Sequence, residues 1–262
     1  MGMSIGIGLG ITTQRRRGVF SPAALFANGE DGAWFDIDPQ YLFQDDAGTT
    51  PVTAPGQPVG FVTDRSGNGN HATQATAEAR PTYQTDGTLH YLHFDGVDDF
   101  LVTPTITPGT DKAQVFAGVR KLSDSTQLLI ELSENSSFNN YCFGVLELDG
   151  GDTRANSSGT ERINVFAVNP APASRVYSAL FSVTPSLVAL RFDGASVGSE
   201  ETSQGEAGNY IPESLYICAR EGTSLFYEGH IYGLIARCGP NLTANEIDAT
   251  ELWIANKTGV AL

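Results

Sequence analysis

Short apolar stretches, alternating or continuous, recur along the chain from about residue 111, and turn-forming residues separate them. The stretches cover residues 112–121, 127–132, 141–148, 162–168, 186–193, 214–220 and 229–238. Many short strands divided by Gly, Asn, Asp and Pro are typical of two packed antiparallel sheets, so the pattern predicts an all-β sandwich. Strands and helices do not alternate in this pattern, which argues against a parallel α/β sheet. The polar, glycine-rich segment 149–159 is expected to connect two strands.

One helix is predicted, at the C-terminus. Thr243 and Glu246 form a capping box, in which each side chain accepts a hydrogen bond from the other residue's free backbone N–H. Ile247 and Ile254 recur at helical spacing and are expected to pack on the sandwich. Gly259 is a stop signal, so the helix is expected to end near residue 256 or 257.

The N-terminal third is richer in turns than the rest of the chain. Three prolines predict a loop or an edge hairpin over residues 45–60. The polar loop 64–71 has two interpretations: a glycan- or metal-contacting loop, or a tight turn at Asn68-Gly69, which is favoured. Residues 91–101 predict a strand that is interrupted by a turn at Asp95-Gly96.

Composition and charge narrow the function classes. The chain has 262 residues with 40% apolar side chains, enough for a large core and too many for global disorder. No apolar run reaches the roughly 18–20 residues that cross a bilayer, so membrane insertion is not expected. The net charge of −15 argues against nucleic acid as a partner, because phosphates would be repelled.

The charge is unevenly distributed. Residues 1–29 contain three arginines, Arg15, Arg16 and Arg17, and no acid. A secretory signal places its positive charge before its apolar region, whereas here the weakly apolar residues 5–11 come first, so we expect synthesis in the cytoplasm and a flexible or docking arm. The cysteines Cys142, Cys218 and Cys238 show no metal-binding spacing and are expected to be buried thiols.

Three parts of the sequence resemble concanavalin A-like domains of the laminin-G and pentraxin type. They are Leu-His-Phe-Asp-Gly-Val-Asp-Asp-Phe at 92–100, Leu-Arg-Phe-Asp-Gly at 190–194, and the ending from Phe-Tyr-Glu-Gly-His-Ile-Tyr at 226–232 to Leu-Thr-Ala-Asn-Glu at 242–246. Their order and spacing cover about residues 60–262. The resemblance implies a two-sheet antiparallel jelly roll.

A second resemblance covers the N-terminal part. Phe-Ser-Pro-Ala-Ala-Leu-Phe at 20–26, Gly-Ala-Trp-Phe-Asp at 32–36 and the stretches 42–53 and 64–76 resemble the start of a group of tailed-phage and prophage proteins. Where that group shows Trp-Tyr-Asp-Pro, this chain has Trp-Phe-Asp-Ile-Asp-Pro at 34–39, which should alter only a local turn. The resemblance implies a virion protein, commonly tail-associated, that contains a lectin-like sandwich.

From this resemblance we expect a docking arm over residues 1–32 and a sandwich over 33–262, with a loop-rich first segment at 33–86. The candidate particle-docking residues are Arg15, Arg16, Arg17, Phe20, Leu25 and Phe26. The expected partners are other virion proteins and a host-surface glycan, and a homotrimer or ring is expected on the particle. Tail or baseplate is favoured as the position; capsid decoration or a head fibre is the alternative.

The sequence offers candidate residues for three kinds of chemistry. Concanavalin A-like glycoside hydrolases use E-x-D-x-x-E on one strand, and the nearest match, Glu147 to Asp152, lacks the final Glu, so a non-enzyme is expected. Loop residues between strands are the glycan-binding candidates: Asn139, Asn140, Asp149 and Asp152. Calcium is the one cofactor considered, with Asp95, Asp98 and Asp99 as ligands; the alternative is that these acids form a turn and face solvent.

Overall fold

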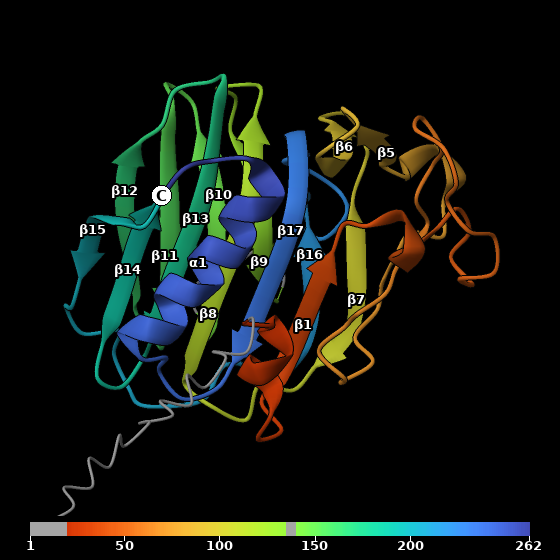
Figure 1. Ribbon diagram of the computed structural model, residues 1–262. Coiled ribbons are helices and arrows are strands. Elements are labelled where there is room, and N and C mark those ends of the chain that lie inside the picture. The colour runs from red at the N-terminus through yellow and green to blue at the C-terminus, as the bar shows by residue number, and fades with distance from the viewer. Residues whose placement is uncertain (1–19, 135–139) are drawn as a thin grey trace, which may run out of the picture.

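The alternating segments form two antiparallel sheets that pack face to face (Figure 1). The computed structural model describes residues 20–134 and 140–262. The first sheet contains β1 (Asp31–Asp36), β5 (Thr82–Thr85), β6 (His90–Asp95), β8 (Lys112–Lys121), β13 (Ala173–Ser182), β14 (Leu187–Phe192), β15 (Ala195–Glu200) and β17 (Glu228–Cys238). The second contains β2 (Leu42–Phe43), β3 (Phe61–Val62), β4 (Ala72–Thr73), β7 (Leu101–Ile106), β9 (Gln127–Leu132), β10 (Cys142–Leu148), β11 (Asp152–Ser158), β12 (Arg162–Val168) and β16 (Glu213–Ile217). The predicted all-β sandwich is confirmed.

The strand order places chain-distant segments next to each other. The eight-stranded sheet runs β15-β14-β13-β8-β17-β6-β5, and β1 pairs with β17 beside β6. The nine-stranded sheet runs β12-β11-β10-β9-β16-β7-β4-β3-β2. Short 3-10 helices, η1 (Pro22–Phe26), η2 (Pro39–Tyr41) and η3 (Ala77–Ala79), lie in the N-terminal third.

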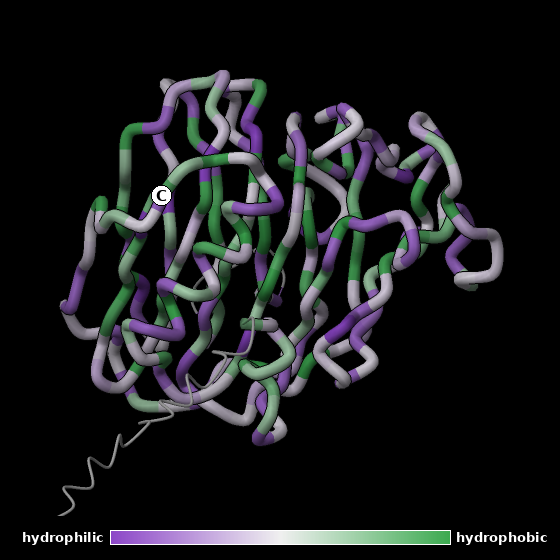
Figure 2. The backbone as a smooth tube through the Cα atoms, viewed as in Figure 1, coloured by the Kyte–Doolittle hydropathy of each residue, from purple (hydrophilic) through white to green (hydrophobic). Residues whose placement is uncertain are grey.

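The core lies between the two sheets. It is built from the side chains that point inward, which are every second residue of each strand. Phe143 and Phe181, from opposite sheets, stack with ring centroids 5.3 Å apart, and Tyr210 meets Phe143 edge-on. Figure 2 shows hydrophobic residues along much of β17, which has partners on both sides. Burial of these apolar side chains is the main driving force for the fold.

Helix α1 (Ala244–Thr258) covers the outer face of the eight-stranded sheet, against β8, β13 and β17 (Figure 1). Ile254, fully buried, packs there with Phe116 and Ile235 of the sheet. The helix approaches closely because Gly118 has no side chain: a Cβ there would lie 2.4 Å from Cγ2 of Thr258. The predicted capping box of Thr243 is confirmed, and the helix ends one residue later than expected.

The N-terminal boundary of the sandwich differs from the prediction. Leu25 and Phe26 are 3% and 7% exposed and pack in the cluster beneath α1, so these two docking candidates are occupied within the chain. Arg237 fixes the segment by donating from Nε to the carbonyl of Leu25 and by pairing with Glu30 at 2.9 Å. Residues 22–32 therefore belong to the packed body and not to an arm.

The other docking candidates fall into two groups. Phe20 is partly buried against the same cluster as Leu25. The three arginines Arg15–Arg17 lie outside the described residues.

Two long strands were missed. The segment 149–159, expected to be a connection, contains β11, and β13 was not predicted at all. The three cysteines are buried thiols, as predicted. None of the helices in residues 20–134 and 140–262 has the length and apolar character needed to cross a membrane.

Candidate ligand-binding face

The outer face of the nine-stranded sheet carries a continuous row of cross-strand neighbours. Asn164 of β12 lies opposite Asn156 of β11, which lies opposite Gly144 of β10. Gly144 in turn lies opposite Glu131 of β9, and Glu131 opposite Tyr216 of β16. Neighbours along these strands, such as Ala155, Val165 and Leu215, belong to the core, so alternation directs the row outward. Five strands at about 4.8 Å spacing give a row roughly 19 Å long.

The asparagine end of the row contains buried polar atoms without partners. Asn156 is fully buried, and neither its Nδ2 nor its Oδ1 makes a hydrogen bond. Oδ1 of Asn164 and Nε of Arg154, which lies two residues from Asn156 on β11, are likewise buried and unpaired. Leaving such a group unpaired costs about 1–3 kcal/mol, so folded proteins keep few of them. Four such atoms on two neighbouring strands make this end of the row a candidate ligand-binding site.

The other end of the row is acidic and constrained. The fully buried Glu131 accepts hydrogen bonds from the backbone N–H of Glu221 (3.1 Å) and from Nε of Arg220 (3.4 Å). Burial raises the pKa of Glu131 to about 7, although Arg220 opposes the shift. A pocket of about 400 Å³ adjoins it, lined by Ser133, Glu134, Glu213, Tyr216 and Glu221.

The loop between β16 and β17 borders this end in a strained conformation. Cys218, Glu221 and Leu225 have φ values of 67°, 49° and 52°, which non-glycine residues adopt rarely. Leu225 packs on the outer side of β9 and β10, against Leu128 and Leu146. Strain of about 1–3 kcal/mol per residue persists where the surrounding structure enforces it, and it clusters at functional sites.

An aromatic side chain flanks the row. Phe166 of β12 lies opposite Arg154 in the register and is 52% exposed. Amides, a guanidinium and an exposed aromatic ring together supply hydrogen bonds for hydroxyl groups and an apolar platform for a ring.

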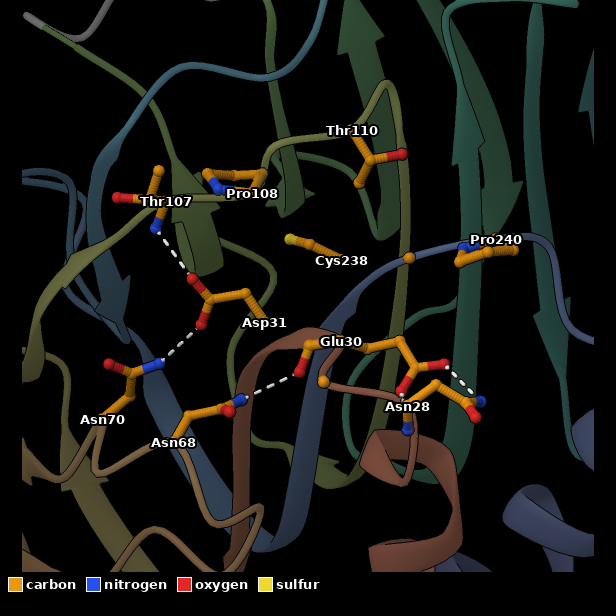
Figure 3. A pocket seen from close by; sticks show the side chains of 12 residues that line it. Asn28, Glu30, Asp31, Asn68, Asn70, Thr107, Pro108, Thr110, Cys238 and Pro240 are labelled. Atoms are coloured by element: carbon orange, nitrogen blue, oxygen red, sulfur yellow. Dashed lines mark hydrogen bonds between the residues drawn. The ribbon is translucent and has the colours of Figure 1, made fainter.

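A second candidate is a cleft of about 790 Å³ at one end of the sandwich (Figure 3). Its polar groups already bond to one another: Asp31 accepts from the N–H of Thr107 (3.0 Å) and from Nδ2 of Asn70 (3.0 Å), and Asn68 donates to the carbonyl of Glu30 (3.0 Å). The two asparagine bonds join the N-terminal segment to loop 64–71, and the Thr107 bond joins it to the segment after β7. The cleft is therefore a structural junction whose polar groups are already paired.

Loop 64–71 is organised by Asp64. Its carboxylate accepts hydrogen bonds from the N–H groups of Trp34 (2.9 Å), Ser66 (2.8 Å) and Asn70 (2.9 Å). Gly69 has a φ of 78°, as a tight turn requires. The turn interpretation therefore fits the loop's geometry.

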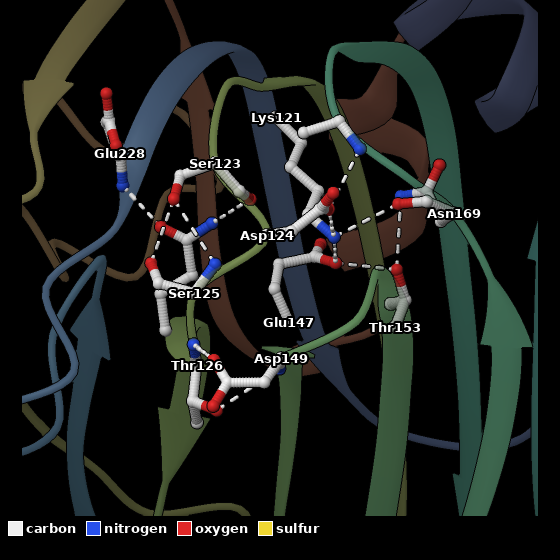
Figure 4. Close-up of polar contacts among 12 residues, drawn as sticks. Lys121, Ser123, Asp124, Ser125, Thr126, Glu147, Asp149, Thr153, Asn169 and Glu228 are labelled. Carbon is white, nitrogen blue, oxygen red and sulfur yellow. Dashed lines mark hydrogen bonds and ion pairs between the residues drawn. The ribbon is translucent and has the colours of Figure 1, made fainter.

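The structure does not bring the predicted glycan residues together. Asn140 is exposed before β10, whereas Asp149 and Asp152 lie beyond its other end, and Asn139 lies outside the described residues. Oδ1 of Asp149 accepts the backbone N–H of Thr126 (2.8 Å), which ties two turns together (Figure 4). Sequence reasoning missed Asn156, Asn164 and Arg154, and the one apolar residue of β11, Ala155, gave no alternation that could have revealed that strand.

The nearest match to a hydrolase motif is a buried structural network. Glu147 faces the interior, fully buried, with Nζ of the equally buried Lys121 3.3 Å away (Figure 4). Thr153 and Tyr177 donate hydrogen bonds to its carboxylate at 2.7 and 2.9 Å. Burial raises the pKa of Glu147. A carboxylate closed in between two sheets has no room for a sugar, so this residue offers no hydrolase site.

The predicted calcium ligands do lie together. Asp95, Asp98 and Asp99 bring one carboxylate oxygen each within 4.8 Å of the others. Burial and the neighbouring Asp95 raise the pKa of Asp99 to about 7. Oδ1 of Asp95 also accepts the N–H of Val97 (2.8 Å), as in the turn interpretation. Calcium takes six to eight oxygen ligands, so these carboxylates would supply part of a shell, and calcium binding stays a prediction.

Comparison with solved structures of other proteins supports the β-sandwich fold. No protein-family model and no curated protein matches the chain. Among solved structures, the binding domain of botulinum neurotoxin serotype D aligns with a TM-score of 0.57 and 9% identity over 73% of this chain and 48% of that one. For serotype G the TM-score is 0.56, with 11% identity over 73% of this chain and 48% of the other.

A structure of botulinum neurotoxin type C, whose cell entry depends on interaction with two ganglioside molecules, gives a TM-score of 0.59 and 9% identity over 89% of this chain and 53% of that one. The chain thus spans about half the length of these structures. At such low identity the likeness shows the β-sandwich fold alone.

Proposed function

We propose that this protein is a non-enzymatic, glycan-binding β-sandwich of a tailed-phage particle, which uses the outer face of the nine-stranded sheet to contact the host surface. The main support is the set of unpaired polar atoms on this face, Oδ1 of Asn164 and Nε of Arg154 beside the amide of Asn156. Because the folded chain covers Asn156 completely, a glycan reaches its amide only when the covering side chains move. A sugar hydroxyl both donates and accepts hydrogen bonds, so it can satisfy both atoms of an amide at once.

The fold comparison is consistent with this role. Several similar structures are receptor-binding domains of botulinum neurotoxins, and cell entry of the type C neurotoxin depends on ganglioside molecules. The phage assignment rests on the sequence resemblance over residues 20–76. A position on the tail or baseplate, synthesis in the host cytoplasm, other virion proteins as partners and a trimer or ring are parts of the same proposal.

The glycan part is tested by binding of the purified protein to a glycan array and to host lipopolysaccharide. Asn156→Ala should lower the affinity about tenfold, because it removes two hydrogen bonds in a desolvated site. Asn241→Ala is the matched control, since Asn241 is exposed just before α1 on the opposite side of the molecule. Equal loss in both variants, or no binding by the wild type, would refute the glycan role.

The particle part needs its own measurements. Mass spectrometry of purified particles should find the protein, and labelled antibodies should place it on the tail. Labelling of the head would favour the capsid alternative. Release of reducing sugar from a bound glycan would overturn the non-enzymatic assignment.

A further inference from the structure

We infer that the ligand is an acidic saccharide, whose carboxylate lies between Arg154 and Arg162 on β11 and β12. This inference rests on the proposed function and names the class of glycan. It follows from the placement of charge on the outer face of the nine-stranded sheet.

Two arginines flank the unpaired asparagines. Arg154 precedes Asn156 by two residues on the same face of β11, and Arg162 precedes Asn164 in the same way on β12. Because the strands are antiparallel and Asn156 lies opposite Asn164, the two arginines lie on either side of the asparagine pair. A ligand group over the asparagines therefore lies between the two arginines, whose Cα atoms are roughly 14 Å apart at ordinary strand spacing.

Neither guanidinium is neutralised by the residues of the described segments. Arg154 and Arg162 form no ion pair with any side chain in 20–134 or 140–262, whereas Arg220 on the same face pairs with Glu131 at 3.4 Å. The pKa of Arg154 is lowered by burial and by repulsion from Arg162 and Arg220. A half-buried guanidinium next to like charges is unfavourable unless an anion compensates it. In a chain with a net charge of −15, carboxylates are abundant, yet none in the described residues forms an ion pair with Arg154 or Arg162.

The charge balance favours a carboxylate over a phosphate. The arginine fork matches either group with two parallel hydrogen bonds. However, Asp152 lies two residues before Arg154 on the same face, and Glu131 lies further along the row. The positive charge of the arginines thus exceeds the negative charge of these carboxylates only slightly. Such a site suits a carboxylate, with one negative charge, better than a phosphate, which carries nearly two. The uncharged remainder of the saccharide would extend over the asparagines and beside Phe166.

The test compares oligogalacturonate with its methyl ester, in which each carboxylate is replaced by an uncharged ester that is one methyl group larger. Wild-type protein should bind the acid about tenfold more tightly, and salt should reduce the difference. Arg154→Gln and Arg162→Gln should remove the preference. Arg120→Gln, which changes an exposed arginine on β8 of the other sheet, should preserve it. Calorimetry measures all four proteins with both ligands.

Equal affinity for acid and ester, or no binding of the acid, overturns the inference and leaves the proposed function to the host-glycan test. A second measurement, thermal unfolding without ligand, shows whether Arg154 stabilises the fold. Without ligand, Arg154→Gln should unfold at the same temperature as the wild type or higher, because like-charge repulsion is relieved. A lower unfolding temperature means that Arg154 supports the fold, which also overturns the inference.

Discussion

The two sheets of this sandwich use their outer faces in opposite ways. The outer face of the eight-stranded sheet is apolar, with Phe116, Val176 and Ile235, and helix α1 buries it. The outer face of the nine-stranded sheet carries Asn156, whose amide is unpaired, and Asn164, whose Oδ1 is unpaired. The first face is completed by the chain itself, whereas the second has the chemistry of a surface completed by another molecule. Under the proposed function, the same architecture separates stability and recognition onto opposite sides.

The largest loss of stability is expected from a change to the side chains that helix α1 buries on the eight-stranded sheet. Ile254→Ala should lower the free energy of unfolding by about 2–5 kcal/mol, because it removes a fully buried side chain and leaves a cavity. Denaturant titration measures this loss. Leu252→Ala on the same helix is the control: Leu252 is 55% exposed, so its loss should stay near 0.5 kcal/mol or less. If the two variants were alike, the helix would not be docked as described.

The next largest effect is a pH dependence of stability that comes from Glu131 on the outer face of the nine-stranded sheet. The pKa of Glu131 is raised from 4.5 to about 7, so the folded protein binds a proton more tightly than the unfolded chain. The wild type should therefore lose stability as pH rises through the interval from 4.5 to 7, by up to about 3 kcal/mol. Glu131→Gln should match the wild type at pH 4 and exceed it at pH 8 in thermal unfolding. A difference that is independent of pH would contradict this account of Glu131.

A smaller effect concerns Asn156 and has the opposite sign. Asn156→Val should raise the free energy of unfolding by about 1–2 kcal/mol, since it removes unpaired polar atoms and suits a strand. The same variant should bind glycan less tightly. Denaturant titration and array binding of one preparation measure both. Should the variant be less stable than the wild type, the polar face would be structural, and the contrast between the sheets would fail.

The smallest effect returns to the helix. Thr243→Ala should cost about 1 kcal/mol, because it removes the side chain that caps the N–H of Glu246. Urea titration alongside Ile254→Ala gives the ratio of the two losses. Packing should exceed capping; the reverse order would mean that local hydrogen bonds, and not burial on the sheet, hold α1.

Local signals allowed much of the scaffold to be predicted. The segments 112–121, 127–132 and 162–168 match β8, β9 and β12, because apolar runs mark strands that are buried on at least one face. The capping box identified the start of α1 correctly. By contrast, β11 has a single apolar residue, Ala155, so hydrophobicity could not reveal it.

The candidate site was missed for a related reason. Asn164, Asn156, Glu131 and Tyr216 are scattered over some 85 residues and come together only through the register of five strands. Register depends on which strands become neighbours, which no local pattern encodes. The acidic trio from Asp95 to Asp99 could be predicted because its members share one turn.

The pairing of β1 with β17 has a consequence for how the protein is made. Asp31 pairs with Cys238, so roughly 200 residues must be synthesised after β1 before its partner exists. At about 5–20 residues per second, β1 waits on the order of 10–40 s on the ribosome. Throughout that time Trp34 and Phe35 lack the contacts that bury them in the finished fold. The nascent chain thus exposes the unpaired strand β1, with its apolar side chains, until β17 has been synthesised. Chaperone binding during translation should therefore concentrate on residues 31–36.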